Sequence, residues 1–223
     1  MAGQLSKMLF WLWPPLEARH ADRRIVEPSD QEFQDYFSGV VLSLQSQPTP
    51  SPLFDEAKRV QDSELARHKA LEDKGQSFVV SAGLAVSVIS LVPSLFSEKQ
   101  ELPLTWSVIV GLVYFLAILH FVIAALYGLK ARGRARLMQP SADTFVSSAS
   151  LTAVEQIAYV VAQAKWNEPA LMKKSNYVLV SERMFFRGLG LLVGGLFVVI
   201  ATTIATKFAG SACPIPFAGA PWL

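Results

Sequence analysis

The segment GLGLLVGGLFVVIATTIAT, residues 188–206, contains no charged side chain and decides the class of this protein. Two further stretches share this property: FVVSAGLAVSVISLVPSLF at residues 78–96 is uncharged, and residues 104–129 contain His120 as their single ionisable group. A helix needs about 20 apolar residues to cross a hydrocarbon core of about 30 Å, and all three stretches are long enough. The sequence therefore predicts an all-α integral membrane protein with transmembrane helices at 78–96, 104–129 and 188–207.

The overall composition agrees with this class. Of the 223 residues, 52% are hydrophobic and 17% are charged, whereas soluble domains usually have about 25% charged residues. Three uncharged helices buried in a soluble protein would need a much larger polar shell. The net charge of +2 argues against a strongly basic nucleic-acid-binding domain, although it leaves room for a local basic patch. The single Cys excludes an internal disulfide, and no Cys/His cluster suggests a zinc site.

Basic residues set the expected orientation. Of the 20 Lys and Arg residues, nine precede the first predicted span and nine lie between the second and the third. The positive-inside rule places both regions in the cytoplasm. We therefore expect a cytoplasmic N-terminus, an outer hairpin at 97–103 and an outer C-terminal tail at 208–223.

Residues 1–28 form a separate N-terminal segment. Its run KMLFWLWPPL is too short an apolar stretch for a secretory signal and lacks a cleavage site. The side chains of Phe10, Trp11 and Trp13 suit the membrane interface, where Trp rings lie at headgroup depth. We expect this segment to be an interfacial anchor or a plug below a pore. The alternative is a helix packed on the chain's own cytosolic part.

The next segment, residues 29–52, combines a short helix with a linker. Apolar residues at helical spacing predict a helix at 30–44, which Ser29 or Asp30 could cap. The Pro/Ser-rich stretch QSQPTPSP then prevents a helix and predicts the linker. Residues 53–77 lack proline, so we expect a charged helix that runs without a break into the first span.

Residues 130–187 are predicted to be a cytosolic helical region. The second span should continue past residue 129, and a further helix is expected at 150–166. Asn167-Glu168-Pro169 should break that helix, and Pro169 should start a new one that continues into the third span. Each span would then have a cytosolic extension, and the extensions together would form a stalk below the membrane.

The third span carries two rows of small residues, which predict helix packing. Gly188, Gly195 and Thr202 are seven residues apart, while Gly190 and Gly194 form a GxxxG pair on another side of the helix. Small residues let helix backbones approach closely in lipid. One row could pack on the chain's own helices, and the other would be free for a second subunit. We expect a homo-oligomer, with a tetramer as the first guess; the alternative is that glycine is simply common in membrane helices.

Few polar groups lie inside the predicted spans. Ser87, Ser90 and Ser94 follow one side of the first span, and His120 lies in the second. They could line a wet pore or a gate. The alternatives are serine hydroxyls bonded to their own helix and a neutral His bonded to a neighbouring hydroxyl. No catalytic motif, metal site or cofactor motif is present, so we expect no enzyme.

Clustered basic residues in the cytosolic segments are candidates for binding an anionic ligand. Lys130, Arg132, Arg134 and Arg136 form one cluster, Lys173 and Lys174 form another, and Arg183 is a further candidate. Phosphates are attracted to such clusters with a strong dependence on salt. The alternative, above all for the first cluster, is ordinary contact with lipid headgroups.

Two stretches resemble a known group of proteins. The charged helix SELARHKALEDKGQSFVVSAG at residues 63–83 runs into an apolar hairpin, and KKSNYVLVSERMFFRGLG at 173–190 enters a further span. This pattern, over about residues 53–208, resembles the SLATT-like membrane effectors of bacterial antiphage defence. The resemblance implies a pore in the bacterial inner membrane, encoded beside a nucleotide-producing or nucleic-acid-sensing partner such as a nucleotidyltransferase or nuclease.

The sequence therefore favours a gated membrane pore of antiphage defence, controlled on its cytosolic side by a nucleotide, an oligonucleotide or a partner protein. Three spans show no internal repeat of the kind found in transporters, and they are too few to enclose an aqueous path, so a pore would need several copies. A non-conducting membrane anchor that recruits a cytosolic enzyme is the alternative.

Overall fold

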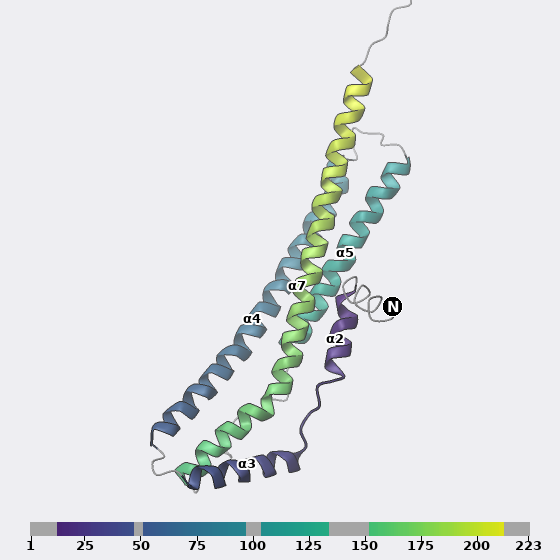
Figure 1. Cartoon of the computed structure of the whole chain (residues 1–223). Coiled ribbons are helices and arrows are strands. Elements are labelled where there is room, and N and C mark those ends of the chain that lie inside the picture. The colour runs from purple at the N-terminus through teal and green to yellow at the C-terminus, as the bar shows by residue number, and fades with distance from the viewer. Residues whose placement is uncertain (1–12, 47–50, 97–103, 134–151, 212–223) are drawn as a thin grey trace, which may run out of the picture.

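The computed structural model describes residues 13–46, 51–96, 104–133 and 152–211, and this part of the chain contains five α-helices. Three long helices, α4 (Ser51–Phe96), α5 (Leu104–Arg132) and α7 (Ala153–Ser211), pack along one another. Two short helices, α2 (Pro14–Asp22) and α3 (Asp30–Gln45), lie against α7. Figure 1 shows α2 beside the lower end of α5, and α3 across the base of the bundle.

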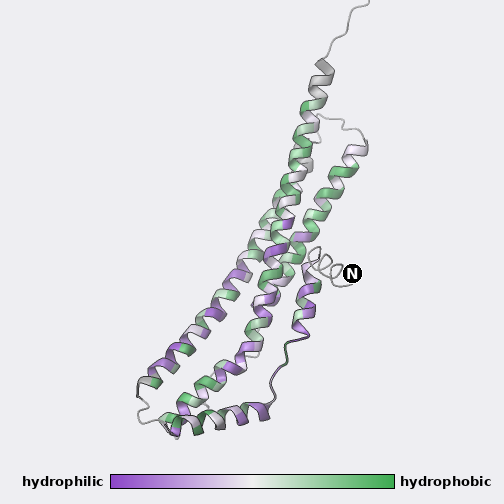
Figure 2. Ribbon diagram, viewed as in Figure 1, coloured by the Kyte–Doolittle hydropathy of each residue, from purple (hydrophilic) through white to green (hydrophobic). Residues whose placement is uncertain are grey.

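The three long helices are each long and apolar enough to cross a membrane. Within the described residues, the structure therefore confirms an all-helical fold with three helices that could cross a membrane. In Figure 2, the upper parts of these helices are mainly hydrophobic and the lower parts are mixed or hydrophilic. We call the lower part, residues 53–77, 130–133 and 153–187, the charged half, and the three predicted spans the apolar half.

Two of these helices are much longer than a membrane requires. The α4 helix has 46 residues and α7 has 59, whereas a helix of about 20 residues already covers 30 Å. Both helices pass from the charged half into the apolar half without interruption. The predicted continuation of residues 53–77 into the first span is thus present as a single helix.

The predicted break at residues 167–169 is wrong, because α7 continues through Pro169. A proline inside a helix removes one backbone hydrogen bond and costs about 3 kcal/mol. Packing on both sides opposes that cost: Ala162 before the proline and Leu171 after it are buried. Figure 1 shows α7 bending in its lower part, and proline is a usual cause of such bends.

The α3 helix is capped as the sequence predicts. Glu32 N–H donates to Ser29 Oγ (3.3 Å), and Ser29 N–H donates to Glu32 Oε2 (2.7 Å), which completes a capping box. Phe33 is buried on the inner face of α3 and meets Trp166 of α7 edge to face at 5.4 Å between ring centroids. Tyr159 of α7 contacts the same aromatic group. This contact fixes α3 across the end of α7.

The helices α4 and α5 approach closely where the two halves meet. A Cβ atom on Gly75 of α4 would lie 2.9 Å from the Gly128 carbonyl oxygen of α5, and one on Gly128 would lie 2.7 Å from the Gly75 oxygen. From α7, the buried Ser181 hydroxyl donates to the Ala124 oxygen at 2.7 Å. Because only glycine lacks a Cβ, these two positions permit the crossing.

Candidate functional site

The N-terminal residues 13–28, which we call the strap, are bound to the chain's own helices. Ala18 of α2 is buried in a cluster with Ala124 and Tyr127 of α5 and with Val180 and Met184 of α7. The Trp13 ring meets the His120 ring edge to face, with 6.4 Å between centroids. Since His120 lies inside the predicted second span, Trp13 reaches the apolar half. Residues 13–22 are thus packed on the chain's own helices, but Trp13 contacts the predicted second span and not the cytosolic part named in the packed alternative. Phe10 and Trp11 lie outside the described residues.

Polar contacts hold the strap along α7. The Glu17 carboxylate pairs with Arg183, and the Glu27 carboxylate pairs with Lys173. Between them, Asn176 Nδ2 donates to Asp22 Oδ1 at 3.3 Å. The partners descend along α7 as the strap residues ascend, so the strap runs antiparallel to α7. The carboxylates of the strap therefore neutralise Lys173 and Arg183, two of the cations that were predicted to bind an anionic ligand.

A buried lysine joins α4 and α7 beside the strap. The side chain of Lys174 is only 3% exposed. Its Nζ donates to Glu72 Oε1 at 2.7 Å and lies 2.7 Å from His68 Nε2. An ammonium group is only a donor, so His68 Nε2 accepts this bond and the imidazole is neutral. We call these three residues the lysine lock.

The lysine lock shifts the acid–base properties of its members. Burial lowers the pKa of His68 below its ordinary value of 6.5, the charge of Lys174 lowers it further, and Glu72 opposes both. For Glu72, burial raises the pKa, but the hydrogen bond and charge of Lys174, with the charges of His68 and Arg132, bring it below 4.5. Both shifts favour a neutral imidazole beside a charged carboxylate.

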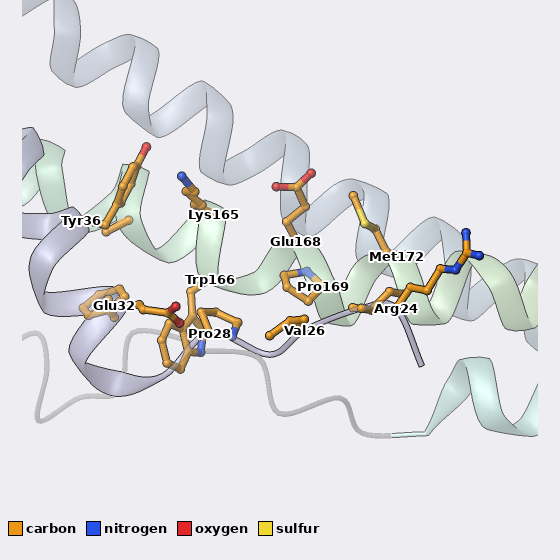
Figure 3. Close-up of a pocket in the computed structure, with 13 residues that line it drawn as sticks. Arg24, Val26, Pro28, Glu32, Tyr36, Lys165, Trp166, Glu168, Pro169 and Met172 are labelled. Atoms are coloured by element: carbon orange, nitrogen blue, oxygen red, sulfur yellow. The ribbon is translucent and has the colours of Figure 1, made fainter. Parts of the chain in front are cut away.

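Two hollows lie next to the strap. A cleft of about 630 Å³ is bordered by Glu27, Lys130, Lys173 and Tyr177, with Lys174 and Trp166 behind them. An adjoining trough of about 580 Å³ runs between the strap, α3 and α7. Figure 3 shows this trough, in which Trp166 and Pro169 of α7 face Pro28 and Val26 of the strap. The cleft has three lysines and one glutamate on its border, whereas the trough has two cations and two anions.

The structure separates the six basic residues predicted to bind an anion. Lys173 and Lys174 border the cleft, but Lys174 already donates to both partners in the lysine lock. Arg183 pairs with the strap, and Arg132 donates to Gln76 Oε1 at 3.0 Å. Arg134 and Arg136 lie outside the described residues. Besides these six residues, Lys130 of the first predicted cluster borders the cleft and stands 4.8 Å from the Tyr127 ring centroid.

The polar groups predicted to line a pore bond to their own helices. Ser87 donates to the Gly83 oxygen at 3.0 Å, and Ser90 donates to the Val86 oxygen at 2.9 Å. His120 Nδ1 lies 2.7 Å from the Leu116 oxygen. Ser94 is in the last part of α4, and its side chain is outside the described part. Within one chain, the Ser87 and Ser90 contacts agree with the alternative of hydroxyls bonded to their own helix. The contact of His120 is to a backbone oxygen of its own helix and differs from the hydroxyl partner of the alternative.

The two small-residue rows of α7 have different surroundings. A Cβ on Gly188 would lie 3.0 Å from Phe121, and one on Gly195 would lie 3.2 Å from Val113, so both glycines pack against α5. Thr202 donates to the Val198 oxygen at 2.9 Å within α7. Gly190 and Gly194 would meet nothing within 4 Å. They border a shallow apolar groove between α5 and α7.

The groups of the lysine lock on α4 were not predicted. His68 and Glu72 are four residues apart, which places them on one helix face, and this spacing is the signal that could have found them. The glycines at the crossing were not predicted either: Gly75 lies three residues before the predicted first span, and Gly128 lies near the end of the predicted second span.

Comparison with protein families, with characterised proteins and with solved structures found no match for this chain. The resemblance to the SLATT-like effectors therefore rests on the two quoted stretches alone.

Proposed function

We propose that this chain is the subunit of a gated, homo-oligomeric pore in the bacterial inner membrane. Its charged half faces the cytoplasm, where a signal controls opening. When it is activated, the pore disrupts the membrane as part of antiphage defence. The resemblance to the SLATT-like effectors supports the setting, and the shape of the chain supports the gating.

The continuity of the long helices carries this proposal. The α7 helix holds Lys173, Lys174 and Arg183 at one end and the third span at the other. The α4 helix likewise joins Glu72 to the first span. A continuous helix transmits a tilt or a shift along its length. A change at the lysine lock or at the strap would therefore move the membrane-spanning parts.

A pore needs several copies of this chain, because three packed helices leave no lumen. Large apolar side chains remain exposed on the spans, among them Leu84 and Val88 of α4 and Val193 and Phe197 of α7. The open Gly190/Gly194 face allows a close approach of a second copy. We propose a tetramer arranged around a central axis.

The proposed signal is an anionic nucleotide or oligonucleotide, supplied or sensed by a companion nucleotidyltransferase or nuclease, or a partner protein. Lys130, Lys173 and Arg132 are the cations best placed for it, since all three lie at the charged half and keep contact with solvent. A ligand shifts a gate only by binding its open and closed forms with different affinity. The strap could provide these two forms: one in which Glu17 and Glu27 pair with α7, and one in which these ion pairs are broken.

Purification in detergent followed by mass photometry and flux from proteoliposomes tests this function. A pore predicts particles of several times 24.5 kDa together with ion flux. Particles without flux under any tested condition would favour the non-conducting anchor that recruits a cytosolic enzyme.

A further inference from the structure

We infer that the cleft between the strap and α7 is a phosphate-binding site in which Glu27 of the strap occupies the position of the phosphate. Lys130 and Lys173 are the ligands of the phosphate. Its binding displaces the Glu27 carboxylate and loosens the strap. The inference deepens the proposed function, because it names the chemistry and the internal competitor of the cytosolic signal.

The contacts of the cleft identify its ligand as an anion. Lys173 and Lys130 line it from two different helices, α7 and α5, and Tyr177, whose phenol hydrogen-bonds with Asp22, lines it as well. The acidic group on its border, Glu27, already pairs with Lys173. A carboxylate bound by a lysine shows that the position accepts an oxyanion. A phosphate carries more charge and more acceptor oxygens than a carboxylate, so it is the stronger ligand for two lysines.

Exposure decides which ion pairs can be exchanged. The Glu27 side chain is 77% exposed and Lys173 is 27% exposed, and exposed pairs contribute little to stability. Lys174 has an almost fully buried side chain, and removing a partner from such a pair is strongly unfavourable. A phosphate therefore replaces Glu27 at Lys173, while the lysine lock stays closed.

Phosphate at this place has two sources. Lys130 directly follows the predicted second span. In a membrane its side chain would therefore lie near the surface, within reach of the headgroup of an anionic lipid. A soluble phosphate compound enters from the cytoplasmic side of the cleft. Both sources use the same lysines, and the experiment distinguishes them.

Binding is measured first with sodium tripolyphosphate, by isothermal titration calorimetry on the full chain in zwitterionic lipid nanodiscs. Lys130→Gln and Lys173→Gln should each weaken binding about tenfold, as expected for loss of one charge-assisted contact. Glu27→Gln should strengthen it several-fold, because the competitor is neutralised. Lys165→Gln and Glu168→Gln are the matched controls: both change one charge on α7 outside the cleft, and both should bind as wild type does.

Release of the strap is measured by trypsin cleavage after Arg23 and Arg24, identified by mass spectrometry. Both arginines are exposed and lie between the Asp22 and Glu27 contacts. Tripolyphosphate should accelerate this cleavage in wild type, and Glu27→Gln should accelerate it without any ligand. Glu168→Gln should leave the cleavage rate unchanged.

The lipid arm repeats both measurements in nanodiscs that contain an anionic phospholipid. If the strap is already loose and tripolyphosphate binds weakly there, the headgroup is the phosphate source. If the anionic lipid changes neither, the source is soluble. The inference is overturned if neither phosphate source binds. It is also overturned if the affinity for tripolyphosphate is the same in wild type and in Lys130→Gln, Lys173→Gln and Glu27→Gln. None of these readouts requires conduction, so the site can be present in a protein that fails the flux test.

Discussion

Lys174 Nζ of α7 lies 2.7 Å from Glu72 Oε1 of α4. Among the described residues, Lys174 is the one charged group that is buried. Its removal from water is compensated by the two contacts of the lysine lock, to Glu72 and to His68. The contact joins the two longest helices within the charged half.

Replacing Lys174 by Met should destabilise the protein by about 2 kcal/mol. The usual loss on breaking a fully buried pair is about 3–5 kcal/mol, and Glu72 reduces it because its side chain remains 33% exposed. The measurement is the midpoint of thermal unfolding in detergent. Lys173→Met is the matched control, since its exposed pair should cost less than about 1 kcal/mol. Equal midpoints for the two variants would refute the role given to the lock.

The protein should lose stability as the pH falls. The pKa of His68 is lowered in the folded state, so the unfolded chain binds a proton first, near its ordinary value of 6.5. The stabilisation is therefore complete above pH 6.5 and decreases as the pH falls below it. Glu72, whose pKa is also lowered, adds a second loss below its ordinary value of 4.5.

His68→Gln should flatten the first of these two decreases and leave the second in place. Unfolding midpoints between pH 8 and pH 4 measure both. The control is His20→Gln, which removes an exposed histidine from α2. A wild-type profile that is flat between pH 7 and pH 5 would contradict the neutral imidazole of the lock.

Gly128→Ala should destabilise the bundle by about 1–3 kcal/mol, the usual effect of overpacking. The added Cβ would lie 2.7 Å from the Gly75 oxygen and 3.0 Å from Val79 Cγ2. Gly83→Ala is the control on α4, where a Cβ meets nothing within 4 Å. Unfolding midpoints in detergent compare the two. If Gly128→Ala is tolerated as well as Gly83→Ala, the close crossing of α4 and α5 is wrong.

The two small-residue rows should respond differently to a large side chain. Gly194→Leu should reduce assembly and leave the single chain stable, because Gly194 faces open space. Gly195→Leu should destabilise the chain itself, since its Cβ would press on Val113 at 3.2 Å. Mass photometry measures assembly, and thermal unfolding measures the chain. Normal assembly of Gly194→Leu would place the oligomer interface elsewhere.

The membrane-spanning helices could be predicted because the absence of charge over 20 residues is a local property. The cap of α3 was equally local: Ser29 and Glu32 are three residues apart. The predicted break at Pro169 failed because a proline acts on one hydrogen bond, whereas the packing of Leu171 and Ala162 depends on distant segments.

The candidate site could be predicted only in part. Basic residues were visible in the sequence, but their partners come from positions that are far apart: Glu27 for Lys173, Glu17 for Arg183 and Glu72 for Lys174. Only the fold shows which lysines are neutralised and which one, Lys130, is left at the cleft. In the same way, the sequence showed two glycine rows, and the fold assigned Gly188 and Gly195 to the inside of the chain.

Ion flux from proteoliposomes is the most direct test of the proposed pore. Vesicles are reconstituted with the full chain, with and without tripolyphosphate, and with a chain that lacks residues 1–28. We expect release above that of empty vesicles in at least one condition, and a clear difference between the full and the shortened chain, since removing the strap uncovers Lys173 and Arg183. Release equal to that of empty vesicles in every condition, from protein shown by mass photometry to be oligomeric, would contradict the pore.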